Sequence, residues 1–240
     1  VLPYFKKVEH DLDYDGPYHG QSGRIPIRRL FEDQWCGHAK GLAQAFSNLG
    51  FKYVEDQNGE YVDGYFGLAI SNAYERRVSA AIGYLDSVTR ARPNLVIKTN
   101  CQITNLLFDG NTCIGVEAIH EGRVSNFKAG EVILSAGAIH SPAFLLRAGI
   151  GPAHELHEHE ICVRAHRPGV GMNLMDHPTV SIAAFLLPAA RINNNTRRNM
   201  QIGLRYSSTL PDTPSGDMLL GVASRSSWHA VGKQIGTTLI

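Results

Sequence analysis

The stretch EVILSAGAIHSPAFLLRAGIGP, residues 131–152, decides the fold because it joins an apolar run to a helix through a corner of very small residues. The apolar run predicts a strand buried on both faces, in the middle of a parallel or mixed sheet. We expect Ser141 to cap the helix, Pro142 to occupy its first turn and Gly149 to end it.

The corner at residues 135–138 presents bare backbone where the predicted strand ends. In open α/β folds, ligands bind at the carboxyl edge of the sheet, so a flat ligand can come close to such a corner. A second interpretation is that the small residues only let the helix pack tightly on the strand. Taken alone, the residues of the corner leave both interpretations open.

The segments on either side predict a mixed α/β architecture. Apolar spacing and turn residues predict helices over 1–10, 38–49 and 71–91, a short strand over 24–28 and a turn-rich loop over 56–67. From residue 94, apolar runs separated by turn residues predict strands over 94–99, 101–108, 113–119 and 123–128, which together form a β-meander. Beyond a glycine-rich loop after residue 167, predicted strands over 179–187, 199–208 and 217–226 suggest an antiparallel sheet.

Composition restricts the function classes. The chain has 240 residues, 43% of them hydrophobic and 19% charged, so it can bury the core of one large domain or two modest ones. A formal net charge of +1, with scattered Lys and Arg, gives no reason to expect a nucleic-acid partner. No run has the length of a membrane-spanning segment and the cysteines form no C-x-x-C pair, so we expect a reducing, cytoplasmic location. The chain opens without Met and ends on an apolar run, so we also expect a fragment.

Several segments along the chain carry a family resemblance. They are VLPYFKK, YHGQSGRIPI, RVSAAIGYL, RPNLVIKTNCQITNLLFDG, EVILSAGAIHSP and, from residue 168, PGVGMNLMDHP. In order and approximate spacing they resemble the glucose-methanol-choline (GMC) oxidoreductases, flavoenzymes that oxidise alcohols with FAD. Residues 199–232 are similar to members close to hydroxymethylfurfural oxidases and choline dehydrogenases. Phe144 and Ala148 depart mildly from the family pattern.

The resemblance implies an α/β (α+β) fold with two domains. A partial FAD-binding domain, with a mixed parallel sheet and a β-meander, would comprise residues 1–15 and 67–175. Part of an antiparallel-sheet substrate-binding domain would comprise residues 16–66 and 176–240. The chain would therefore cross between the domains more than once.

The resemblance also implies the cofactor contacts and the reaction. Ser135, Ala136 and Gly137 would lie against the ADP half of FAD, where a larger side chain would collide with the cofactor. The backbone of Ile103 would recognise the adenine edge, since main-chain N–H and C=O groups pair with it whatever the side chain. Hydride would pass from the CH–OH carbon of a small-molecule alcohol to flavin N5, and oxygen or another electron acceptor would reoxidise the flavin.

Two parts of the family's machinery are not found in the sequence. Gly169-Val170-Gly171 has Leu174 where a phosphate-binding G-x-G-x-x-G turn needs its third glycine. In the family this turn lies far upstream, and the catalytic His and its partner lie near the C-terminus, so the resemblance places both outside this chain. We therefore assign no catalytic residue and no metal ligand, and interpret His177 as structural.

Three alternatives stay open. The first is a His-rich metal-binding protein, because HELHEHE, residues 154–160, places His154 and His157 beside Glu158. The segment does not match the H-E-x-x-H pattern, and we favour a solvated helix end. GQSGR, residues 20–24, lacks the second glycine of a hydrolase nucleophile elbow. The third alternative is a non-catalytic module that keeps the fold without the cofactor.

Overall fold

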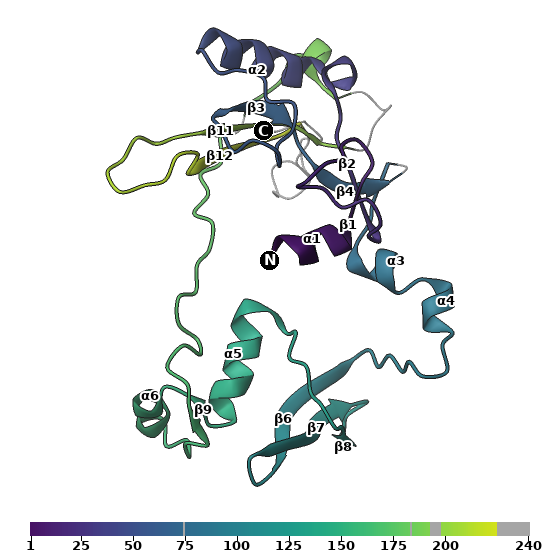
Figure 1. Ribbon diagram of the computed structural model, residues 1–240, viewed down its shortest axis with the longest axis vertical. Coiled ribbons are helices and arrows are strands. Elements are labelled where there is room, and N and C mark those ends of the chain that lie inside the picture. The colour runs from purple at the N-terminus through teal and green to yellow at the C-terminus, as the bar shows by residue number, and fades with distance from the viewer. Residues whose placement is uncertain (74, 183, 193–197, 225–240) are drawn as a thin grey trace. The chain divides into compact units, whose positions relative to one another are not determined.

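The computed structural model describes residues 1–73, 75–182, 184–192 and 198–224. It divides into two compact units, one formed by Val1–Leu95 with Val180–Ile240 and the other by Val96–Thr179 (Figure 1). We call them unit 1 and unit 2 and describe each by itself. This division by contacts does not test which residues belong to a FAD-binding or a substrate-binding domain, so that assignment stays a prediction.

Unit 1 contains two small sheets. Its elements are α1 (Leu2–Val8), β1 (Glu9–Asp11), β2 (Ile25–Arg28), η1 (Glu32–Gln34), α2 (Gly37–Asn48), β3 (Gly64–Gly67), β4 (Ile70–Ala73), β5 (Arg76–Arg77), α3 (Ala80–Tyr84), α4 (Ser87–Arg90), η2 (Pro188–Ala190), β11 (Met200–Tyr206) and β12 (Met218–Ala223). One sheet has the order β1-β2-β4-β5, with β1 and β2 parallel and the other pairs antiparallel. The other sheet, β12-β11-β3, is antiparallel throughout, which confirms the antiparallel sheet expected around residues 199–226.

The core of unit 1 lies between α2 and the β12-β11-β3 sheet (Figure 1). The helix predicted over 38–49 is confirmed, and Gly50 at φ +91° follows its end. Phe46 is buried on this helix, whereas Leu49 at its end is 74% exposed. Ala39 is also buried, since small residues let the helix approach the strands closely.

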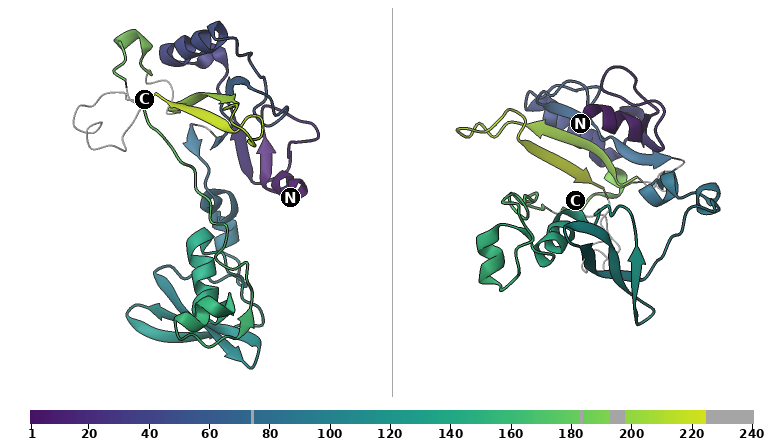
Figure 2. Two further views of the ribbon diagram at one scale, coloured as in Figure 1. Left: turned by 90° about the vertical axis from the view of Figure 1, so that its left-hand side faces the viewer. Right: turned by 60° about the horizontal axis from the view of Figure 1, so that its bottom comes forward.

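Unit 2 is built on the predicted meander. It contains β6 (Cys101–Asp109), β7 (Thr112–His120), β8 (Arg123–Lys128), α5 (Gly137–Arg147), β9 (Ile150–Gly151), α6 (Ala153–Glu158) and β10 (Ala165–His166). The first three strands pair antiparallel in the order β6-β7-β8, with α5 beside them (Figure 2). Gly110, Glu121 and Gly122 have positive φ in the two tight connections, as hairpin turns require. The meander is confirmed over its last three predicted strands, whereas residues 94–99 do not join it.

Three predicted strands are wrong. Residues 94–99, 131–135 and, among those described, 179–187 have no strand structure, and Ile133 is 79% exposed. A strand is stable only when its N–H and C=O groups pair with a neighbour, and no described strand pairs with these segments. An apolar run therefore indicates a strand only where a partner is available.

The predicted helix over 71–91 is also wrong. The structure has β4, β5, α3 and α4 there, because two side chains start new helices: Ser79 accepts a hydrogen bond from the Ile82 N–H and Asp86 accepts one from the Thr89 N–H. The loop expected over 56–67 ends in β3, which forms because β11 pairs with it. The sequence around residues 64–67 alone does not indicate that β11 will pair with it.

The helix after the small-residue corner begins earlier than predicted. α5 starts at Gly137, so Ser141 is inside the helix and is not its N-cap residue. Ser141 Oγ still accepts a hydrogen bond from the Ala136 N–H at 2.9 Å, and so satisfies a donor that the helix leaves free. Gly149, at φ +80°, follows the end of α5 as expected.

Candidate functional site

The walls of a cleft of about 650 Å³ in unit 2 come from β6 and α5. Its lining residues are Gln102, Ile103, Thr104, Ala136, His140, Phe144 and Arg147. The structure thus brings Ile103 and Ala136, two of the four predicted cofactor-binding residues, into one cleft although 32 positions separate them. The volume lies in the range of small-molecule and cofactor sites.

The other two predicted residues flank Ala136 without lining the cleft. Ser135 and Gly137 are both exposed. A Cβ atom added at Gly137 would meet no atom of the described residues within 4 Å, so the space beside this glycine is open in that part of the chain. Gly137 adopts φ +85°, a backbone conformation that residues with a Cβ atom rarely adopt. A glycine is therefore also required here for the local backbone conformation.

The backbone of Ile103 lies on the edge strand of the meander. Ile103 pairs with Ala118 of β7, and no strand among the described residues pairs with the opposite edge of β6. An edge strand has unpaired N–H and C=O groups along its free side. Such groups can recognise the edge of a flat heterocycle by hydrogen bonding, whatever the side chain.

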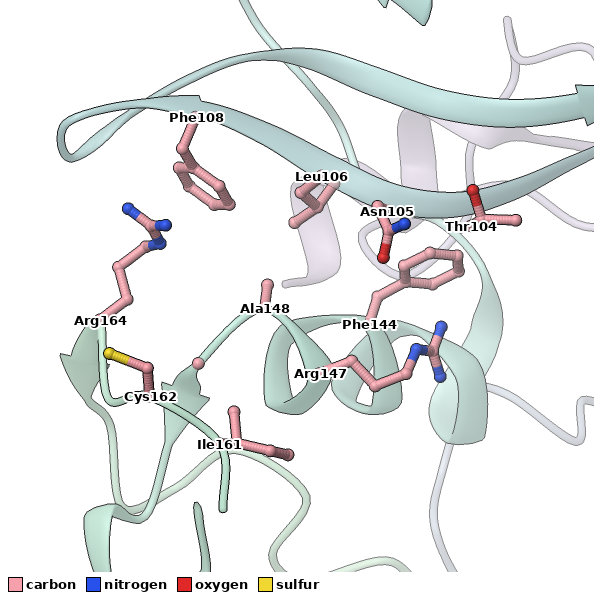
Figure 3. Close-up of a pocket in the computed structure, with 11 residues that line it drawn as sticks. Thr104, Asn105, Leu106, Phe108, Phe144, Arg147, Ala148, Ile161, Cys162 and Arg164 are labelled. Carbon is pink, nitrogen blue, oxygen red and sulfur yellow. The ribbon is translucent and has the colours of Figure 1, made fainter. Parts of the chain in front are cut away.

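A second pocket of about 300 Å³ adjoins this cleft and shares Thr104, Phe144 and Arg147 with it (Figure 3). The Arg147 guanidinium carbon lies 4.6 Å from the centre of the Phe144 ring, and that of Arg164 lies 4.1 Å from the Phe108 ring. These contacts restrict the two cations. No carboxylate is among the residues that line the pocket, so its electrostatics favour an anionic group.

Hydrogen bonds on the meander surface stabilise the ionised form of Glu117, which belongs to β7. Thr104 Oγ1 and Asn105 Nδ2 each donate to Glu117 Oε1 at 2.7 Å. The bond from Thr104, followed by that from Asn105, lowers the pKa of the Glu117 carboxyl. The three side chains join β6 to β7 at the irregularity between Ile103 and Asn105.

The other sequence-predicted candidates are at the surface. His154, in α6, is 73% exposed and its Nε2 lies 3.8 Å from a Glu155 oxygen. His177 is also exposed, in the loop after β10. Ser22 precedes β2, whereas a nucleophile elbow follows a strand and opens a helix, so the structure does not support the hydrolase alternative.

The structure also contains a buried group of charged residues that sequence reasoning missed. Glu9 and Asp11 of β1 face His19, and the potential ligand atoms of the three side chains lie within 4.8 Å of one another. We call these three residues the Glu-Asp-His cluster. The available signal was the Glu-x-Asp spacing, because alternate residues of a strand point to the same face.

Comparison with known proteins assigns the family. The profile of the GMC oxidoreductases matches residues 1–179, and the chain belongs to this family. It is 43% identical over 240 aligned positions to the 5-(hydroxymethyl)furfural oxidase of Methylovorus sp. (strain MP688), covering 95% of this chain and 45% of that protein. It is 36% identical to the mitochondrial choline dehydrogenase of Mus musculus, covering 85% of this chain and 34% of that protein. The chain therefore spans less than half the length of these relatives.

Solved structures of the same family share the fold. The pyridoxine 4-oxidase of Mesorbium loti aligns with a TM-score of 0.76 and 26% identity, covering 93% of this chain and 44% of that one. A formate oxidase of Aspergillus oryzae, studied for modification of its FAD, aligns with a TM-score of 0.71 and 25% identity over 86% of this chain and 41% of that one. Among the described residues, no helix is long and apolar enough to cross a bilayer.

Proposed function

We propose that this chain forms part of an FAD-dependent oxidoreductase that acts on the CH–OH group of a small-molecule alcohol. FAD would supply the two-electron oxidation by taking the hydride of the carbinol carbon, and the hydroxyl proton would pass to a base that we do not assign, so the product would be an aldehyde or ketone. Oxygen or another electron acceptor would then reoxidise the flavin. Membership of the GMC oxidoreductases supports this reaction class.

The observation that carries the proposal is the cleft between β6 and α5. Ile103 and Ala136 both line it, and the space beside Gly137 is open. In our proposal the free edge of β6 recognises the adenine, while residues 135–137 let the ADP half approach the backbone. The chain's own contribution is then binding and orientation of the cofactor, and we assign no catalytic residue within it.

We also propose a division into domains, which rests on the family resemblance. Residues 1–15 and 67–175 would belong to the FAD-binding domain, and residues 16–66 and 176–240 to the substrate-binding domain. We also propose a cytoplasmic location, on the ground that all four cysteines are free.

The decisive experiment measures flavin content and nucleotide competition in protein expressed from the whole gene. The absorption spectrum should show bound FAD, and ADP should displace it more effectively than FMN, because the cleft is proposed to hold the ADP half. Ala136→Val should lower FAD affinity at least about tenfold, by placing two methyl groups in the cleft at a cost of at least about 1.4 kcal/mol. Ala129→Val is the matched control, since Ala129 is exposed in the same unit and does not line the cleft.

The substitution at residue 136 avoids the strained backbone of Gly137, whose positive φ would make a valine there disturb α5 directly. Circular dichroism should therefore be the same for both variants. Absence of FAD from the wild-type protein would refute the proposed function. Equal FAD affinities of the two variants would refute the placement of the cofactor against Ala136.

A further inference from the structure

The Glu-Asp-His cluster has the geometry of an incomplete coordination sphere. His19 Nδ1 lies 3.1 Å from Asp11 Oδ2 and 3.7 Å from Glu9 Oε1. The side chains of His19 and Asp11 are 3% and 0% exposed, and that of Glu9 is 16% exposed. Glu9 thus lies at the rim, and the other two donors lie beneath it.

A neighbouring carboxylate fixes the orientation of the imidazole ring. His19 Nε2 lies 2.7 Å from Asp56 Oδ2, so in the neutral ring Nε2 carries the proton and donates it to this carboxylate. The lone pair of Nδ1 is then directed into the cluster. A carboxylate behind a ligating histidine is the usual outer partner that fixes the tautomer in metal sites.

The buried nitrogen at the centre of the cluster is His19 Nδ1. It is inaccessible to solvent and has no hydrogen-bond partner among the described residues, although Asp11 Oδ2 lies within ion-pair distance. A nitrogen lone pair beside two carboxylate oxygens is repulsive unless a positive charge lies among them, and a proton or a metal ion can supply it. The absence of hydrogen-bond geometry favours the metal ion.

The charges around the cluster point the same way. Ion-pair contacts connect His19 and its neighbours to four carboxylates, those of Glu9, Asp11, Asp13 and Asp56. Two guanidinium groups, those of Arg28 and Arg29, pair with these carboxylates. With a neutral imidazole, two negative charges stay uncompensated in a mostly buried group. One divalent cation balances them, whereas a proton on His19 would balance only half.

We propose that Glu9, Asp11 and His19 bind one divalent transition-metal ion of the zinc type. One nitrogen and two carboxylate oxygens form a donor set that Zn²⁺ accepts, and three protein ligands leave a position for water or another ligand. Asp56 orients His19, and Arg29 holds Asp11 through two contacts of 2.9 Å from Nη1. None of the three proposed ligands lines the cleft that is proposed to hold FAD, so the two proposals can be tested independently.

The test is calorimetric titration of the purified, EDTA-treated chain with Zn²⁺, together with metal analysis after dialysis. The wild-type chain should bind one Zn²⁺. Glu9→Gln should weaken binding at least about tenfold, since the amide removes a charged ligand but can still accept the hydrogen bond from the Gly20 N–H. Asp15→Asn removes an exposed carboxylate from the same segment and should leave binding unchanged, as should His154→Ala on α6.

Each outcome decides the proposal. Failure of the wild-type chain to bind Zn²⁺, equal affinity in Glu9→Gln, or loss of binding in His154→Ala would overturn it. If Glu9→Gln does not fold, Co²⁺ bound to the wild-type chain should give paramagnetically shifted ring protons of a single histidine. Shifted signals from two or more histidines, or from none, would also overturn the assignment.

Discussion

Replacing Arg29 by methionine should destabilise unit 1 severely, because the change leaves buried carboxylates without their cation. The Arg29 side chain is 0% exposed and contacts Asp11 at 2.9 Å and Asp56 at 3.1 Å. Its guanidinium carbon also lies 4.6 Å from the centre of the Tyr14 ring. Methionine keeps an unbranched side chain in the same space and removes the charge and the donors.

The expected loss is about 3–5 kcal/mol of unfolding free energy, the usual cost of removing one partner from a buried ion pair. Arg24→Met is the matched control. Arg24 and its partner Asp86 are 46% and 49% exposed and lie 3.7 Å apart, so this change should cost no more than about 1 kcal/mol. The difference between the two variants isolates the effect of burial from the effect of charge.

Urea unfolding in the presence of EDTA, followed by fluorescence of the buried Trp35, measures both losses. Adding Asp11→Asn to Arg29→Met should recover part of the stability, since it removes the uncompensated charge. If Arg29→Met costs less than about 1 kcal/mol, or if Asp11→Asn makes it worse by its full single-variant cost, the two side chains are not coupled as argued.

Two further predictions concern the core and the meander. Ile202→Ala should lower the free energy of unfolding by about 2–5 kcal/mol in the same assay, because Ile202 is fully buried. Leu49→Ala, at an exposed helix end, should lower it by less than about 0.5 kcal/mol. Equal losses in the two variants would contradict the assignment of the core. The pKa of Glu117, measured by NMR titration, should lie below that of an ordinary glutamate and rise in Thr104→Val. Because folding lowers the pKa of the Glu117 carboxyl, its ionised form stabilises the fold at pH values above the unfolded-state pKa, and this stabilisation is lost as pH falls through the folded-state pKa. An unchanged Glu117 pKa in Thr104→Val would refute the role of Thr104.

The elements that could be predicted from sequence are those whose information is local. The spacing of apolar residues and the glycine after it predict α2, and the turn residues at 109–111 and 120–122 predict the meander. The errors in predicting strands share one cause. Whether residues 131–135 form a strand, or residues 64–67 pair in β3, depends on partners that lie far away in sequence or are not among the described strands.

The candidate site was accessible only in part. Ile103 and Ala136 were assigned to one binding site only through a family resemblance, because neither an isolated isoleucine nor a small-residue corner indicates a ligand. The Glu-Asp-His cluster was not foreseen, since it requires the loop before β2 to fold back onto β1 and Asp56 to arrive from another segment. No short-range pattern records either event.

Two glycines let the beginning of the chain pack backbone against backbone. A Cβ atom at Gly20 would meet the Lys6 carbonyl oxygen, and one at Gly23 would meet the backbone of Val8, so main chain rests directly on main chain there. Side chains can change rotamer to relieve an unfavourable charge, but abutting backbones cannot. Neither glycine can therefore gain a side chain without moving the main chain that carries Glu9 and His19.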